Sequence, residues 1–75
     1  MKLSEAVRER ILILCKQNGI TEEILIHRTD APKDTVREVI MGHDNSISLD
    51  LMYSICSALE ITMQDFFLNN LFESF

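Results

Sequence analysis

The stretch "TDAPKDTVREVIMG", which runs from Thr29 to Gly42, decides the fold of this 75-residue chain. Pro32 suits the first turn of a helix, because its φ angle is already helical and the N–H that it lacks would have no partner there. The apolar side chains then recur at helical spacing, at Val36, Val39 and Ile40. Gly42 can end the helix because glycine adopts left-handed backbone angles without strain. The stretch therefore predicts a short helix that begins near Pro32 and ends at Gly42.

A second short helix is expected immediately before this one. Gly19 ends the preceding element, and the hydroxyl of Thr21 can accept a hydrogen bond from a backbone N–H in the first turn of a new helix. This helix runs from Thr21 to about Thr29. Its inward side chains are Leu25 and part of Ile24 or Ile26. A tight turn through Asp30, which tolerates left-handed backbone angles, joins the two helices. Together they predict a helix-turn-helix unit at about residues 21–41.

The start signal at Thr21 belongs to a pattern that occurs three times. In each copy an Ile precedes a Thr or Ser, and an apolar residue follows four places after the hydroxyl: Ile20-Thr21 with Leu25, Ile47-Ser48 with Met52, and Ile61-Thr62 with Phe66. The hydroxyl caps the helix, and the apolar pair fixes the incoming chain. The pattern predicts an all-α domain of five helices. The other three are expected from Ser4 to about Gln17, from Ser48 to about Leu59, and from Thr62 to about Leu68.

The inward face of each remaining helix follows from its apolar spacing. In the first helix it comprises Leu3, Val7, Ile11 and Leu14. In the fourth it comprises Leu49, Met52, Tyr53, Cys56 and Leu59, and in the fifth Phe66 and Phe67. Ile13 and Leu51 fall outside these faces, so Leu51 is a candidate for contact with another chain.

The C-terminal tail, residues 69–75, carries three large apolar side chains, Leu71, Phe72 and Phe75. This is more apolar surface than a domain of this size leaves in water. The tail therefore either folds back on the first helix or packs against a second copy of the chain.

A single domain accounts for the whole chain, because 75 residues supply one small core and the composition is 47% hydrophobic and 25% charged. The formal net charge is -5, which is the wrong sign for a protein that coats nucleic acid without selection. The charge is unevenly distributed: residues 1–43 contain seven bases and seven acids, whereas the rest contains five acids and no base. A polyanion is therefore expected to bind to the N-terminal half.

The sequence argues against catalysis and against a bound cofactor. Cys15 and Cys56 lie far apart and fall within apolar helical faces, so we expect two reduced thiols in the core and no metal site. His27 and His43 have no partners arranged for nucleophilic catalysis. The longest apolar run, "ILILC", is far shorter than a membrane span. The expected protein is a cytoplasmic one that is not an enzyme and that uses no small-molecule substrate.

Taken in order along the chain, these patterns resemble the phage-repressor family of helix-turn-helix regulators, the Cro-like or XRE family. The resemblance covers the five helices and lies in "NGITEEIL", "APKDTVREVIMG" and "SLDLMYSICSALEITMQDFF". It implies a compact repressor-like domain of a bacterial or phage transcription regulator. In such proteins the second helix braces the DNA backbone and the third lies in the major groove of double-stranded DNA. Useful affinity would require a homodimer on a two-fold site.

The resemblance places the DNA contacts on the third helix and around it. Lys33 and Arg37, four residues apart, share a face and can contact phosphate or base edges, as can Thr35. Asp34 or Glu38 can accept a hydrogen bond from cytosine N4. The supporting contacts are expected from Thr21, Glu22, His43 and Asn45.

Several residues depart from the family pattern and leave a second interpretation open. Where the family often has Gln at the start of the bracing helix, this chain has Glu22; where a Gln-Ser pair is common, it has Lys33 and Asp34; and Met41 replaces an Asn. These changes remove phosphate donors or add negative charge. The charged side chains of the third helix also fit i, i+4 pairs on a solvated face. The alternative is a degenerate helix-turn-helix that serves as a protein interaction module, with weak or no DNA binding.

Overall fold

The computed structural model describes residues 2–43 and 47–73, and all regular structure within those ranges is helical. The elements are α1 (Leu3–Gln17), α2 (Glu22–Arg28), α3 (Lys33–Ile40), α4 (Leu49–Ala58), α5 (Met63–Phe67) and a 3-10 turn, η1 (Asn70–Phe72). The predicted all-α, five-helix architecture is thus confirmed. The candidate contact residues Asn45 and Phe75 lie outside the described residues.

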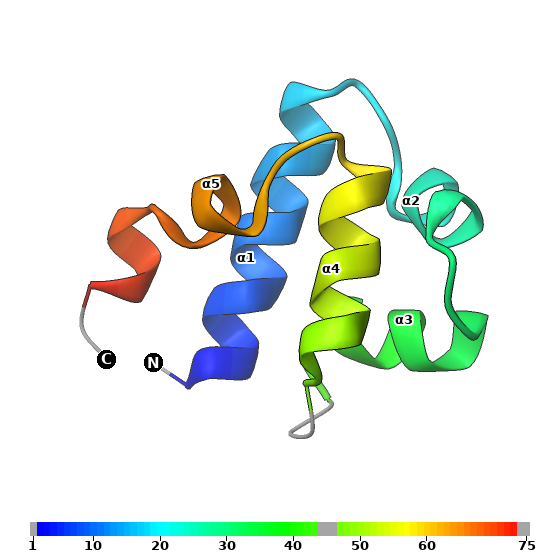
Figure 1. Ribbon diagram of the computed structural model, residues 1–75, viewed down its shortest axis with the longest axis horizontal. Helices are drawn as coiled ribbons and strands as arrows, with labels where there is room; N and C mark the ends of the chain where they lie inside the picture. Colours follow the sequence, from blue (N-terminus) through cyan, green and yellow to red (C-terminus); the bar gives the residue numbers. More distant parts are fainter. Residues whose placement is uncertain (1, 44–46, 74–75) are drawn as a thin grey trace.

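The helix-turn-helix unit lies at one end of the molecule. Figure 1 shows α2 and α3 at one end of the longest dimension and α5 with η1 at the other. Helix α1 contacts α2, α3 and η1, whereas α4 contacts α2 and α5. Helix α3 is therefore held at the edge of the molecule by α1 and α2.

The three predicted hydroxyl caps are all present. Thr21 accepts a hydrogen bond from the backbone N–H of Ile24 at 3.2 Å, and Ser48 accepts one from that of Leu51 at 3.1 Å. At α5, Thr62 accepts from Asp65 at 3.0 Å. The start of α1 is different from the expectation. That helix begins at Leu3 without a side-chain cap, and Ser4 is buried inside its first turn.

The two glycines end their helices as predicted, with φ angles of 66° at Gly19 and 75° at Gly42. Asp30, which tolerates a left-handed conformation, does not adopt one here. The chain turns instead through an extended Thr29, whose hydroxyl donates to the carbonyl of Leu25 at 2.7 Å and whose own carbonyl accepts from the N–H of Ala31 at 3.0 Å. These bonds close the turn, so no residue in it needs a positive φ.

The core is built from all five helices. Its side chains are Val7, Ile11, Leu14, Cys15, Leu25, Ile26, Val36, Val39, Ile40, Leu51, Met52, Ile55, Cys56, Leu59 and Phe66. The inward face predicted for α3 is confirmed, and so are Leu25 and Ile26 in α2. None of the described helices has both the length and the apolar character needed to cross a bilayer.

The predicted inward face of α4 is partly wrong. Leu49 and Tyr53 are 78% and 66% exposed, whereas Leu51, which was expected outside the inward face, is only 5% exposed. The inward stripe runs through Leu51, Met52, Ile55, Cys56 and Leu59, because α4 turns this side toward α2 and α5. Leu3, expected in the core, is also exposed, since it lies at the first position of α1.

The described part of the tail folds back on the domain. The 3-10 turn contacts α1, and Phe72 packs against the core beside Phe67 and Phe66, with ring centroids 5.0 and 6.1 Å away. Leu71 is half-buried. The described part of the tail thus contacts the first helix of the same chain.

An interaction between α1 and α5 was not foreseen. The guanidinium of Arg10 donates from Nε to the carbonyl of Phe66 at 2.8 Å and from Nη2 to that of Asp65 at 2.9 Å. Carbonyls in the last turn of a helix have no partner within the helix, so Arg10 satisfies two of them. This arginine is consequently a structural residue.

Candidate nucleic-acid interface

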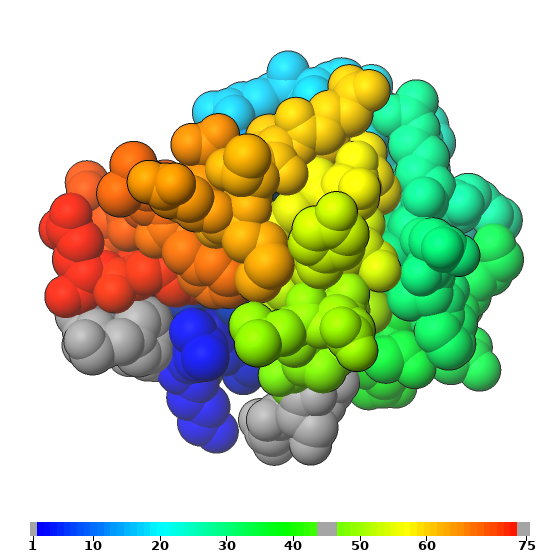
Figure 2. Space-filling view, in the orientation of Figure 1, coloured from blue at the N-terminus to red at the C-terminus, as the bar shows by residue number. Residues whose placement is uncertain are grey.

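Helix α3 buries one face and exposes the opposite one. Val36, Val39 and Ile40 are at most 2% exposed, whereas the charged and polar side chains are all on the surface: Lys33, Asp34, Thr35, Arg37 and Glu38. In the space-filling view α2 and α3 together form one continuous edge of the molecule (Figure 2). Helix α3 is therefore accessible to a long partner such as a duplex.

The carboxylates occupy the middle of this exposed surface. With about 3.6 residues per turn, Asp34 and Glu38 lie on the side of α3 opposite to the buried residues, and Met41 follows on the same side. Met41 is 49% exposed. Lys33 and Arg37 lie at one margin, toward α2, and Thr35 lies at the other. We call Asp34, Thr35 and Glu38 the reading face.

The two cations of α3 are both engaged by α2. Arg37 Nη2 lies 3.5 Å from Glu23 Oε2, and Lys33 Nζ lies 3.1 Å from His27 Nδ1. Glu23 and His27 are four positions apart on α2, and Lys33 and Arg37 are four positions apart on α3. The two contacts therefore lie next to each other, one helical turn apart, between α2 and α3. Glu23 and His27 were not among the residues predicted for this surface. The matching spacing on the two helices was the available signal.

Glu38 makes a third contact, with His43. Its Oε2 atom is 3.8 Å from His43 Nδ1, and both side chains are more than half exposed. A shallow hollow in the surface is lined by Asp34, Thr35, Glu38 and His43. The reading face therefore borders an open space that is wide enough to receive a polar group.

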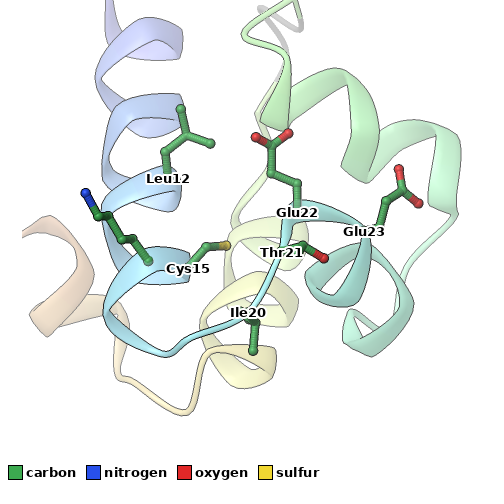
Figure 3. Close-up of a pocket in the computed structure, with 7 residues that line it drawn as sticks. Leu12, Cys15, Ile20, Thr21, Glu22 and Glu23 are labelled. Carbon is green, nitrogen blue, oxygen red and sulfur yellow. The ribbon is translucent and has the colours of Figure 1, made fainter.

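The start of α2 carries negative charge where the resemblance expects phosphate. Thr21 uses its oxygen to cap the helix, so its hydroxyl proton is left to donate to an acceptor. Glu22 and Glu23 project from the first turn of α2 beside a hollow between α1 and α2 (Figure 3). The two carboxylates suit the positive end of the helix dipole, although they repel a phosphate.

Both cysteine thiols lie buried in the core. Burial, assisted by the charge of Glu22, raises the pKa of the Cys15 thiol, which lies between α1 and α2 in Figure 3. Burial also raises the pKa of Cys56 to about 11, against an opposing effect of Arg10. Both thiols are therefore neutral near pH 7 and poor nucleophiles. In residues 2–43 and 47–73 no group of three or more His, Cys, Asp and Glu side chains is placed to hold a metal ion.

The structure distributes the expected contact residues unevenly. Those expected to touch DNA lie exposed on or beside α2 and α3: Thr21, Glu22, Lys33, Asp34, Thr35, Arg37, Glu38 and His43. Of the four expected to meet a partner chain, Leu51 is in the core and is not available for contact. Leu71 and Phe72 are half-buried, and Phe72 packs against the core.

Comparison with known proteins places these elements in a family. The chain matches the profile of the Cro/C1-type HTH DNA-binding domain over residues 10–68, which includes α2, α3, α4 and α5 entirely. Neither a curated protein nor a solved structure matches it. The matched range covers most of the sequence and ends just before the tail. The chain therefore belongs to the Cro/C1-type family of helix-turn-helix DNA-binding domains.

Proposed function

We propose that this chain is a sequence-specific transcription regulator of the phage-repressor type, which inserts α3 into the major groove of DNA. The observation that carries the proposal is the position of α3 at the edge of the molecule, with its polar face outward and α2 beside it. A helix held in this way can enter a groove about 12 Å wide while the start of α2 meets the sugar-phosphate backbone. Family membership supports the same docking.

The charge of the chain argues that it works as a dimer. With a net charge of -5, phosphate neutralisation contributes little, so a single copy binds weakly. Two copies on a two-fold site place their reading helices about 34 Å apart, one turn of the duplex. The body measures 31 × 24 × 18 Å, so this spacing leaves room for two copies side by side.

A second candidate function is supported by the same surface. Glu22, Asp34 and Glu38 oppose a polyanion, and the two nearest cations are already paired with α2. These features favour a helix-turn-helix that binds another protein and has lost most of its affinity for DNA. The two functions differ in whether a duplex binds at all at low salt.

Titration of a labelled random-sequence duplex at two low salt concentrations tests the proposal. A regulator binds measurably, and its affinity falls as salt rises, because binding releases counterions. Arg37→Ala should weaken binding several-fold more than Lys2→Ala, which removes the same charge at the start of α1. Absence of binding at about 20 mM salt, where screening is weak, would instead favour the protein interaction module.

A further inference from the structure

The reading face of α3 has a chemistry that favours one base over the other three. We propose that Glu38, with Asp34 beside it, selects cytosine by accepting a hydrogen bond from the N4 amino group in the major groove. The inference rests on the proposed function, since it concerns which sequence α3 reads once it is docked.

Asp34 and Glu38 are the side chains of α3 that reach the floor of the groove. Asp34 and Glu38 lie opposite the buried face of α3 and are exposed. Arg37 and Lys33 lie at the margin and are turned toward Glu23 and His27 of α2. From that margin the cations face the wall of the groove, where the phosphates are. The carboxylates are left at its floor.

A carboxylate at the floor of the major groove can bind only some base edges. An ionised carboxylate only accepts hydrogen bonds, so it requires a donor on the base edge. Guanine offers two acceptors in the major groove and thymine one acceptor, which both repel it. Adenine has a donor at N6, but the acceptor N7 lies next to it. Cytosine presents its N4 donor and no acceptor on its own major-groove edge, and is therefore the base that fits.

The surroundings of Glu38 leave its carboxylate accessible to a base. His43 Nδ1 is 3.8 Å from Glu38 Oε2, and the hollow lined by both side chains extends to Asp34 and Thr35. The carboxylate thus lies at the rim of an open space. Lys33 and Arg37 on the adjoining margin reduce the repulsion between the acids and the DNA backbone.

The spacing of the two acids sets the form of the site. Residues four apart on a helix have Cβ atoms about 5–6 Å apart, and successive bases rise by about 3.4 Å. Asp34 and Glu38 therefore reach bases that are adjacent or separated by one base pair. The half-site should contain two cytosines at that spacing.

Selection of bound sequences from a random duplex pool tests the inference, with the intact chain and its variant Glu38→Gln. A glutamine pairs with adenine through N6 and N7, so the variant should replace one selected cytosine by adenine. The unaltered chain should bind the cytosine site about tenfold better than the adenine site, and Glu38→Gln should reverse that order. Asp34→Asn should change the other selected position in the same way.

Glu60→Gln is the matched control, because it removes the same charge in the connection after α4, away from α3 (Figure 1). It should select the same sequence as the unaltered chain. If Glu38→Gln also selects that sequence, or if the site lacks cytosine, the inference is overturned while DNA reading stands. If the unaltered chain enriches no sequence, both the inference and the proposed function fail. Circular dichroism of each variant confirms that it is folded.

Discussion

The guanidinium of Arg37 on α3 lies 3.5 Å from the carboxylate of Glu23 on α2. A cation on the proposed reading helix is therefore held by an acid on the helix that precedes it. The two side chains are 45% and 66% exposed, and pairs this exposed contribute about 0–1 kcal/mol. A phosphate can consequently take the place of Glu23 at little cost in stability.

Replacement of Glu23 by glutamine should strengthen binding to a random duplex. The substitution releases Arg37 and removes a negative charge beside the DNA, so the dissociation constant at low salt should fall about threefold to tenfold. The free energy of unfolding should change by less than about 1 kcal/mol. Fluorescence anisotropy and urea unfolding measure the two quantities. An effect no larger than that of Glu60→Gln would show that Arg37 does not meet the DNA.

The carboxylates of Glu22 and Asp34 should, like that of Glu23, oppose binding to a random duplex. If Glu22 and Asp34 face phosphates and the groove, Glu22→Gln and Asp34→Ser should each tighten this non-specific binding and leave helix content unchanged. The expected loss of specificity in Asp34→Ser is a separate effect, which only a selected site would reveal. Unchanged affinity in both variants would mean that α2 and α3 dock on DNA differently or not at all.

The stability of the fold should depend far more on buried Phe66 than on exposed Leu49. Phe66 is fully buried at the junction of α5, η1 and α1, so Phe66→Ala should lower the free energy of unfolding by about 3–5 kcal/mol. Leu49 is 78% exposed, and Leu49→Ala should change it by less than about 0.5 kcal/mol. Urea unfolding followed by circular dichroism measures both. Similar losses in the two variants would contradict the burial described for α4 and α5.

Alkaline pH should destabilise the protein through Cys56. The pKa of this thiol is raised from 9.0 to about 11 in the folded chain, so folding favours the neutral form. Its contribution to stability is complete below about pH 9, and it is lost between there and about pH 11, as the unfolded chain ionises first. The free energy of unfolding should therefore fall more steeply with pH in the unaltered chain than in Cys56→Ala.

The comparison for Cys56 uses the slope and not the absolute stability. Cys56→Ala removes buried volume and should be less stable near neutral pH. All other ionisable groups are the same in the two proteins, so the difference between the two slopes isolates the thiol. Equal slopes would show that Cys56 ionises alike in the folded and unfolded chains.

Local chemistry was sufficient to predict the helices of this chain and the inner face of α3. Thr21, Ser48 and Thr62 cap their helices because a hydroxyl at that position meets backbone donors whatever the rest of the fold does. In α3 the apolar residues form one stripe among charged ones, so only one face can be buried. The sequence is unambiguous in both cases.

Helix α4 shows where that reasoning fails. Its sequence "LDLMYSICSA" is apolar on most sides, and two stripes, one through Leu49 and Tyr53 and one through Leu51 and Ile55, fit helical spacing equally well. Only the packing of α2 and α5 against the helix selects the second. The contacts of Arg37 with Glu23 and of Lys33 with His27 agree with the four-residue spacing on both helices, but which residues meet is set by how α2 and α3 cross.

The hydrogen bonds from Arg10 to the last turn of α5 have a consequence for how the molecule opens. A helix of five residues is too short to persist alone in water, and here its carbonyls are held by a side chain from the middle of a helix of fifteen. The amide protons of α5 should therefore exchange with solvent at the rate at which α1 itself melts, and not by independent fraying. Helix α5 should thus open to solvent only as often as the N-terminal helix does.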